Sequence, residues 1–219
     1  MNRIWRILPG LLIFVTASGA QGQRPPGGEV QQLFEEAQRY HLGIDRPINP
    51  RRAVKLYYEI IKLDPGHADA LYNLAGLCFN QKRYDLAGKY YLEVIKLRPR
   101  EGHAYNNLGS VYEKQGKAER AKRLYEKTIS IDPEIGTAYY NLSRLHFAQG
   151  DAEKALLLIE KAMDLEPDNT AFVNQHGRIK GELGKLSNKT IGAVVGAFAG
   201  LIIVYSLVMR RRRRRSRRG

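Results

Sequence analysis

The stretch over residues 102–135, GHAYNNLGSVYEKQGKAERAKRLYEKTISIDPEI, decides the fold of this chain. Apolar residues recur in its first half at the spacing of one helix face: Tyr105, Leu108, Val111 and Tyr112. Gly116 interrupts this pattern, and glycine ends helices because it adopts the left-handed backbone conformation at little cost. A second amphipathic run follows and stops at Asp132-Pro133. The stretch therefore predicts a pair of helices separated by a short turn.

The same pattern repeats along the chain with a period of 34 residues, which four prolines mark at positions 65, 99, 133 and 167. Residues one period apart form columns of like residues, among them Asn73, Asn107 and Asn141; Leu74, Leu108 and Leu142; and Ala87, Ala121 and Ala155. A single helix pair of this size cannot bury its apolar face, so neighbouring pairs have to stack. The period predicts an all-α fold, a right-handed α-solenoid of helix-turn-helix repeats.

These features resemble the tetratricopeptide repeat family: the 34-residue spacing, the Asn-Leu-Gly/Ala/Ser column and the unit ends in Asp-Pro, Arg-Pro or Glu-Pro. The resemblance divides a domain over 29–184 into a degenerate repeat (29–67), three complete repeats (68–101, 102–135 and 136–169) and a capping helix (170–184). It implies a concave groove, lined mainly by the first helix of each repeat, that binds a protein or a peptide.

The resemblance places this partner-binding groove on the first-helix columns. Its predicted residues are Asp69, Tyr72, Asn73, Phe79, Asn106, Asn107, Ser110, Lys114, Tyr140, Asn141, Arg144 and Phe147. Asn73, Asn107 and Asn141 resemble an asparagine ladder that pairs with the main chain of a peptide, since an amide both donates and accepts. The alternative is that these amides only hold the repeat geometry. Lys114 and Arg144 are the only basic residues among these columns, which disfavours a clamp for a C-terminal carboxylate.

The positive charge of the chain lies mainly at its ends. The formal net charge is +14, yet residues 21–209 hold 26 basic and 22 acidic residues and account for only +4. Eight of the ten residues over 210–219 are arginines. Strong basicity is typical of nucleic-acid binders, but no aromatic residue is interleaved in this tail. We expect the arginines to attract anionic lipid head groups, and we expect no nucleic acid as a partner.

The N-terminal apolar segment, residues 1–20, has the layout of a secretory signal peptide. Arg3 and Arg6 precede an apolar run, and Ser18 and Ala20 are the small residues of a cleavage site after Ala20. An uncleaved signal anchor is the alternative. Residues 21–28 are predicted to form a flexible linker.

The C-terminal apolar segment, residues 190–209, contains no charged residue and is long enough as a helix to cross a hydrocarbon core of about 30 Å. The arginines that follow are costly to translocate, so they predict a cytoplasmic C-terminus and an extracytoplasmic, periplasmic or lumenal, repeat domain. A buried soluble helix is the alternative. Gly192, Gly196 and Gly200 share one face and predict either a transmembrane homodimer or only a glycine-rich membrane helix.

No motif of a hydrolase, a metalloprotease or a nucleotide-binding protein stands in a credible context. Cys78 lies in a predicted core column, and the five histidines form no i,i+3 or i,i+4 pair. We therefore expect no catalytic residue, no metal ion and no cofactor, and we expect the protein not to be an enzyme.

Together these predictions describe a single-pass, membrane-anchored scaffold that mediates protein–protein interaction or complex assembly. Two alternatives stay open. One is an accessory subunit of an envelope enzyme or assembly machine, such as those of cell-wall synthesis, secretion or cytochrome maturation. The other is a cytoplasmic binder of membrane surfaces or nucleic acid that acts through the arginine tail.

Overall fold

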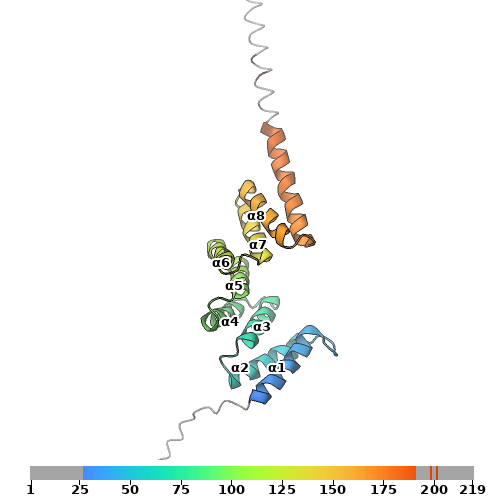
Figure 1. The fold of residues 1–219 in the computed structure, drawn as a ribbon, viewed down its shortest axis with the longest axis vertical. Helices are drawn as coiled ribbons and strands as arrows, with labels where there is room; N and C mark the ends of the chain where they lie inside the picture. Colours follow the sequence, from blue (N-terminus) through green and yellow to red (C-terminus); the bar gives the residue numbers. More distant parts are fainter. Residues whose placement is uncertain (1–26, 191–197, 199–200, 202–219) are drawn as a thin grey trace, which may run out of the picture.

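The computed structural model describes residues 27–190 together with Phe198 and Leu201, and this part of the chain folds into helices and turns only, as predicted. Eight helices carry labels in Figure 1: α1 (Gly27–Leu42), α2 (Pro50–Leu63), α3 (Ala68–Asn80), α4 (Tyr84–Leu97), α5 (Gly102–Lys114), α6 (Ala118–Ile131), α7 (Gly136–Ala148) and α8 (Ala152–Leu165). A further helix begins at Thr170 and continues over residues 170–190.

The labelled helices form four pairs that stack into an elongated array (Figure 1). Each helix packs mainly on the helices next to it in the sequence. The pair α1 and α2 lies at one end of the array, and the helix over 170–190 projects from the other end. The prediction of an all-α solenoid of helix-turn-helix repeats is therefore confirmed for the described residues.

The turns inside the pairs depend on one backbone position that recurs in three repeats. Gly116 and Gly150 have φ angles of 74° and 85°, in the left-handed region that glycine tolerates without steric cost. Lys82 occupies the same column with a φ of 60°, which is uncommon for a residue with a side chain. The turn is thus built in the same way in each of these repeats, although only two of them have the residue that suits it best.

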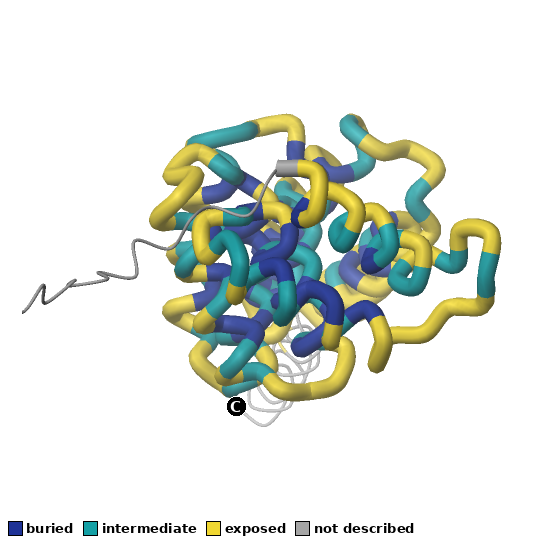
Figure 2. Tube along the Cα trace, turned by 90° about the horizontal axis from the view of Figure 1, so that it is seen from below, coloured by how far each residue is buried: buried dark blue, intermediate teal, exposed yellow. Residues whose placement is uncertain are grey.

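Buried residues lie inside the array with exposed residues around them, as the end-on view in Figure 2 shows, and they form several clusters along the chain. One column of alanines in the second helices is completely buried: Ala53, Ala87, Ala121 and Ala155. A small residue also brings the helices together at Gly109, where an added Cβ atom would lie 2.6 Å from the ring of Tyr125. The close approach of the paired helices therefore requires small side chains at these positions.

Two predicted boundaries are corrected. α1 begins at Gly27, so that the last two residues of the predicted linker over 21–28 belong to a helix. The predicted capping helix over 170–184 does not end at Gly184, because the helix continues without a break to residue 190. Glycine at a helix end is only a tendency, and here the Thr190 hydroxyl still bonds to the Leu186 carbonyl oxygen at 2.9 Å, one helical turn back.

Several predictions concern residues outside the described part of the chain. These are the signal peptide over 1–20, most of the linker, the arginine tail over 210–219, the glycines at 192, 196 and 200, and all of the span over 190–209 except Thr190, Phe198 and Leu201. The latter two residues are helical and exposed. Among the described residues, no helix combines the length and the apolar composition needed to cross a bilayer.

Candidate partner-binding groove

The first helices α3, α5 and α7 line one face of the array, which we call the inner groove. Three hollows open onto it between successive repeats. The first has a volume of about 260 Å³ and is lined by Gly76, Phe79, Asn80, Tyr91, Asn107 and Ser110. The second measures about 410 Å³ and is lined by His103, Asn106, Asn107, Asp132, Glu134, Ile135, Gly136, Thr137 and Glu166. The third measures about 210 Å³ and is lined by Asp69, Tyr72, Val94, Arg98, Glu101 and His103.

Two of the three ladder asparagines bind within the protein. The Asn107 amide donates to the Tyr72 hydroxyl at 2.8 Å, and the Asn141 amide donates to the Asn106 side-chain oxygen at 3.1 Å. Asn106 and Asn141 are only 6% and 9% exposed. Each bond joins one repeat to the repeat before it, so these contacts support the alternative role, in which the amides hold the repeat geometry.

The third ladder residue, Asn73, lies beside the Tyr57 hydroxyl. Burial raises the pKa of Tyr57 to about 12, and the hydrogen bond with Asn73 offsets part of that rise. Tyr57 is itself fully buried and its hydroxyl lies 3.3 Å from Nδ1 of His41. Asn73 therefore lies close to a side chain of the preceding repeat.

Arg144, one of the two predicted groove bases, is held by a carboxylate. Its guanidinium donates to Oε1 of Glu113 at 2.7 Å, while Oε2 of Glu113 accepts from the Tyr125 hydroxyl at 3.0 Å. Desolvation by burial is the largest cause that raises the pKa of Tyr125 above its usual range. Ser110 adds a 3.3 Å contact to the same hydroxyl. Glu113 thus links α5, α6 and α7, and Arg144 is not a free cation for a ligand.

The aromatic residues of the groove differ in whether they pack on the helix over 170–190 or line a hollow. Tyr140 stacks on Phe172 with 5.0 Å between ring centroids, and the Arg144 guanidinium lies 5.6 Å from the Tyr140 ring. The Arg178 guanidinium lies over the Phe147 ring, 5.8 Å from its centroid. These two rings hold the helix over 170–190 against α7. Phe79 instead lines the first hollow and remains partly exposed to solvent.

The outermost predicted groove residues are charged or exposed. Arg98 donates two hydrogen bonds to the Asp69 carboxylate, at 2.7 and 2.9 Å, and these bonds are the largest cause that lowers the pKa of Asp69. Lys114 is exposed at the end of α5. His103 is also exposed and faces two of the three hollows.

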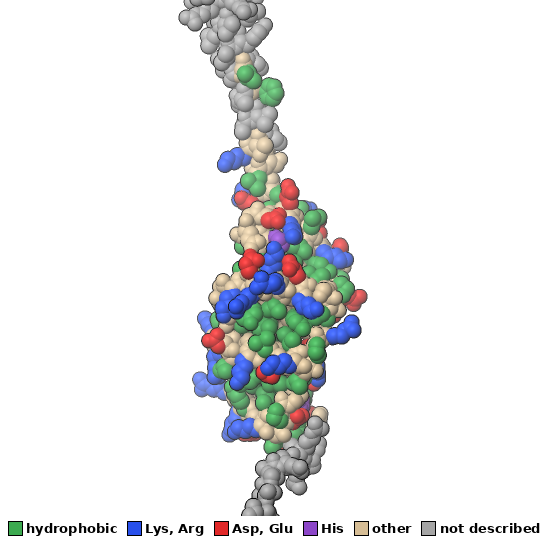
Figure 3. Space-filling view, turned by 90° about the vertical axis from the view of Figure 1, so that its left-hand side faces the viewer, with side chains coloured by type: hydrophobic (Ala, Val, Ile, Leu, Met, Phe, Trp, Pro, Cys, Tyr) green, Lys and Arg blue, Asp and Glu red, His purple; other side chains and the backbone are tan. Residues whose placement is uncertain are grey.

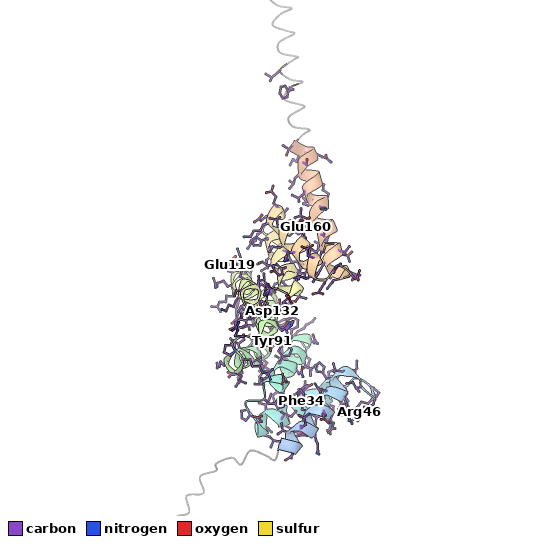
Figure 4. All side chains as sticks on the ribbon, in the orientation of Figure 1. Phe34, Arg46, Tyr91, Glu119, Asp132 and Glu160 are labelled. Carbon is purple, nitrogen blue, oxygen red and sulfur yellow. The ribbon has the colours of Figure 1, made fainter. Side chains whose placement is uncertain are left out.

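The second hollow contains groove residues that the helix columns did not indicate. Asp132, Glu134 and Glu166 line it, and no Lys or Arg does. These three carboxylates come from the ends of repeats, beside Pro133 and Pro167, and not from the first-helix faces. Figure 4 labels Asp132 and Tyr91, which line the second and the first hollow near the middle of the array. The recurring acid-Pro unit ends were the signal available in the sequence.

The remaining candidate residues for chemistry are buried. Cys78 is fully buried, and burial raises the pKa of its thiol. His146, in the same column, is 4% exposed; its Nδ1 lies 3.3 Å from Asp151, and its Nε2 has no hydrogen-bond partner. Among the described residues, no group of three or more His, Cys, Asp and Glu side chains is arranged to hold a metal ion.

Family models of the tetratricopeptide repeat match this chain over residues 66–134 and over residues 112–174. These residues therefore carry tetratricopeptide repeats, as predicted. No curated protein matches the chain significantly.

Solved structures of a protein named MamA are similar to this chain. One MamA crystal structure has 28% sequence identity and a TM-score of 0.57, and the match covers 63% of this chain and 78% of that one. A MamA structure from Desulfovibrio magneticus RS-1, residues 41 to the end, has 25% identity and a TM-score of 0.56, covering 64% and 77%. In all, 388 chains of known structure match, so the fold is widespread and does not by itself specify a partner.

The role of the inter-repeat amides is tested by Asn141→Ala. This substitution leaves the buried Asn106 oxygen without its donor, and we expect it to lower the free energy of unfolding by about 1–3 kcal/mol. Asn174→Ala, at an exposed position, is the matched control and should change stability little. Urea denaturation followed by circular dichroism measures both. An unchanged stability of Asn141→Ala would contradict the role in repeat geometry.

The buried His146 predicts a pH dependence. Desolvation is the largest cause that lowers its pKa below 6.5, and Lys154 and Lys122 lower it further. The unfolded chain therefore binds this proton more readily, so stability should be highest well above pH 6.5 and fall as the pH drops through 6.5. Denaturation at pH 7.5 and 5.5 should show a smaller loss in His146→Gln than in the parent chain. His103→Gln, at an exposed position, should lose as much as the parent.

Proposed function

We propose that this protein is a membrane-anchored, extracytoplasmic scaffold whose inner groove binds a segment of a partner protein and which has no catalytic role. The observation that carries the proposal is the row of three hollows between α3, α5 and α7, with volumes of about 210, 260 and 410 Å³. Repeats of this kind use such faces to hold protein segments, because the array presents an extended surface of side chains on rigid helices.

The chemistry of the groove favours a partner segment with both apolar and basic side chains. Phe79 and Tyr91 give the first hollow an aromatic wall. The second hollow is lined by Asp132, Glu134 and Glu166, so a Lys or Arg side chain is the complementary occupant there. Since the amides of Asn107 and Asn141 are engaged between repeats, we expect these hollows to contribute more to binding than main-chain pairing along the asparagines.

The anchor of the proposed scaffold is the apolar segment over 190–209, with the arginines over 210–219 on the cytoplasmic side. Its support is the absence of charge over 190–209 and the cost of moving the arginines across a bilayer. The helix over 170–190 leads to this segment without a break. The repeat domain would then be joined to the membrane by a helix, and its position relative to the bilayer would be restricted.

The groove is tested by charge reversal in its second hollow. Glu134→Lys should abolish or strongly reduce crosslinks to the native partner, identified by crosslinking and mass spectrometry on intact membranes, because the substitution repels a basic segment. Glu126→Lys, an exposed position on α6 outside the three hollows, makes the same change of charge and should leave the crosslinks unchanged. Equal partner crosslinking in the two variants would contradict the proposed site.

The topology is tested with a reporter fused after Gly219. A reporter that is active only in the cytoplasm should be active, and protease added from the opposite side of the membrane should digest the repeat domain. The physical reason is that eight arginines retain the C-terminus on the cytoplasmic side. A repeat domain that is protected from this protease would contradict the extracytoplasmic location.

A further inference from the structure

A fourth hollow lies on the opposite side of the array from the inner groove, between the second helices α4 and α6; we call it the outer hollow. It measures about 370 Å³ and is lined by Asp85, Gly88, Lys89, Leu92, Glu93, Lys96, Tyr112, Gln115, Lys117 and Arg120. Figure 3 views this side of the molecule and shows hydrophobic side chains gathered in its middle with Lys and Arg side chains around them. This hollow is not used by the proposed function.

The outer hollow combines an apolar floor with a rim that is basic on balance: Asp85 and Glu93 also line it, and Lys96 is paired with Glu93 at 2.8 Å, but Lys89, Lys117 and Arg120 are also there. Leu92 is 42% exposed there although it is a large aliphatic side chain. The Tyr112 ring has two cations close to it, with Lys117 Nζ at 5.6 Å and the Arg120 guanidinium at 5.9 Å from the centroid. Lys89 adds a further positive charge to the rim. The occupant that fits such a surface has an aliphatic side chain flanked by carboxylates.

An aliphatic side chain flanked by carboxylates lies on α8 of the same chain. Leu157 is 69% exposed, the most exposed large hydrophobic side chain among the described residues. In the other repeats its column holds Lys55, Lys89 and Arg123, which are typical of a solvent-facing position. Leu157 therefore departs from the basic residues of its column and presents an apolar side chain on this face.

Carboxylates flank this leucine on one side of α8. Glu153, Glu160 and Asp164 are all exposed and lie one turn before, one turn after and two turns after Leu157. Lys154 and Lys161 occupy its other side. The whole repeat over 136–169 has six acidic and three basic residues, whereas the repeat over 68–101 has four acidic and six basic ones. The outer hollow itself is lined by four basic and two acidic residues, so its charge is opposite in sign to the carboxylate side of Leu157.

We propose that Leu157 of one copy inserts into the outer hollow of a second copy, with Glu153 and Glu160 beside the cationic rim formed by Lys89, Lys117 and Arg120. The contact joins two different surfaces, so in a pair one copy keeps a free hollow and the other keeps a free leucine, and association can extend beyond a pair. It is separate from the inner groove and leaves that surface open to a partner.

Cysteine crosslinking of full-length chains in detergent tests this contact. A chain with Leu92→Cys is mixed with a chain with Leu157→Cys and treated with a short bismaleimide. Cys78 is fully buried and gives little background. We expect a crosslinked dimer that forms from the mixture and not from either variant alone. Its yield should fall several-fold in high salt, since salt screens the charges around the contact.

Matched variants decide the outcome. Leu97→Cys is the control for Leu92→Cys, because Leu97 lies on the same helix with 46% exposure but does not line the outer hollow. Lys89→Glu with Lys117→Glu should reduce the crosslink several-fold, and adding Glu153→Lys with Glu160→Lys to the other chain should restore it. A yield no higher than that of the Leu97→Cys control, or an equal yield from Leu157→Cys alone, would overturn the proposal. Neither result bears on the inner groove, whose test uses Glu134→Lys.

Discussion

The array depends on how closely two helices approach within each pair. A completely buried alanine occupies the same place in every second helix from α2 to α8, at Ala53, Ala87, Ala121 and Ala155. A larger side chain in this column would separate the helices and open a space that the neighbouring side chains could not fill. Because each pair buries its remaining apolar face on the next pair, a fault in one pair would extend to its neighbours. The close contact inside a pair therefore controls the contacts between pairs.

Polar contacts then set how each pair sits on the one before it. Asn107 bonds to Tyr72 and Asn141 bonds to Asn106, each reaching back 35 residues. A second set repeats near the turns, where Gln115 bonds to Asp85 at 2.9 Å and Gln149 bonds to Glu119 at 3.1 Å. Apolar packing alone tolerates sliding, whereas paired hydrogen bonds at two separate places favour one arrangement. The hydrogen bonds between repeats therefore have two effects. They fix the shape of the groove, and they occupy several of its polar groups.

The fold could be predicted from the sequence because the residues that indicate it recur with a fixed period. The proline spacing, the alanine column and the glycines at 116 and 150 each recur, and a recurring signal is hard to produce by chance. The groove was harder to predict, since a column identifies which residues share a face but not which of them bond to one another. Asn141 and Arg144 lie in predicted groove columns, yet both have partners inside the protein.

The sequence was least informative where the chain departs from its own period. The capping helix was predicted to end at residue 184, because no further column of the period marks the residues beyond it, and here the helix continues to residue 190. The second hollow was missed because its carboxylates come from unit ends, which serve mainly as helix stops in a single repeat. Only stacking places Asp132 and Glu166, from successive repeats, on one hollow.

In a repeat protein the positions that recur maintain the fold, so the positions that break the pattern are the ones left to distinguish this chain from others with the same fold. Lys82 breaks the glycine column and keeps the turn, at the cost of an unusual backbone angle. Leu157 breaks a basic column and is 69% exposed. The deviation at Lys82 leaves the turn unchanged, whereas the deviation at Leu157 changes the chemistry of the surface. A single exposed leucine is common on protein surfaces, so what sets Leu157 apart is the row of carboxylates beside it and the complementary outer hollow.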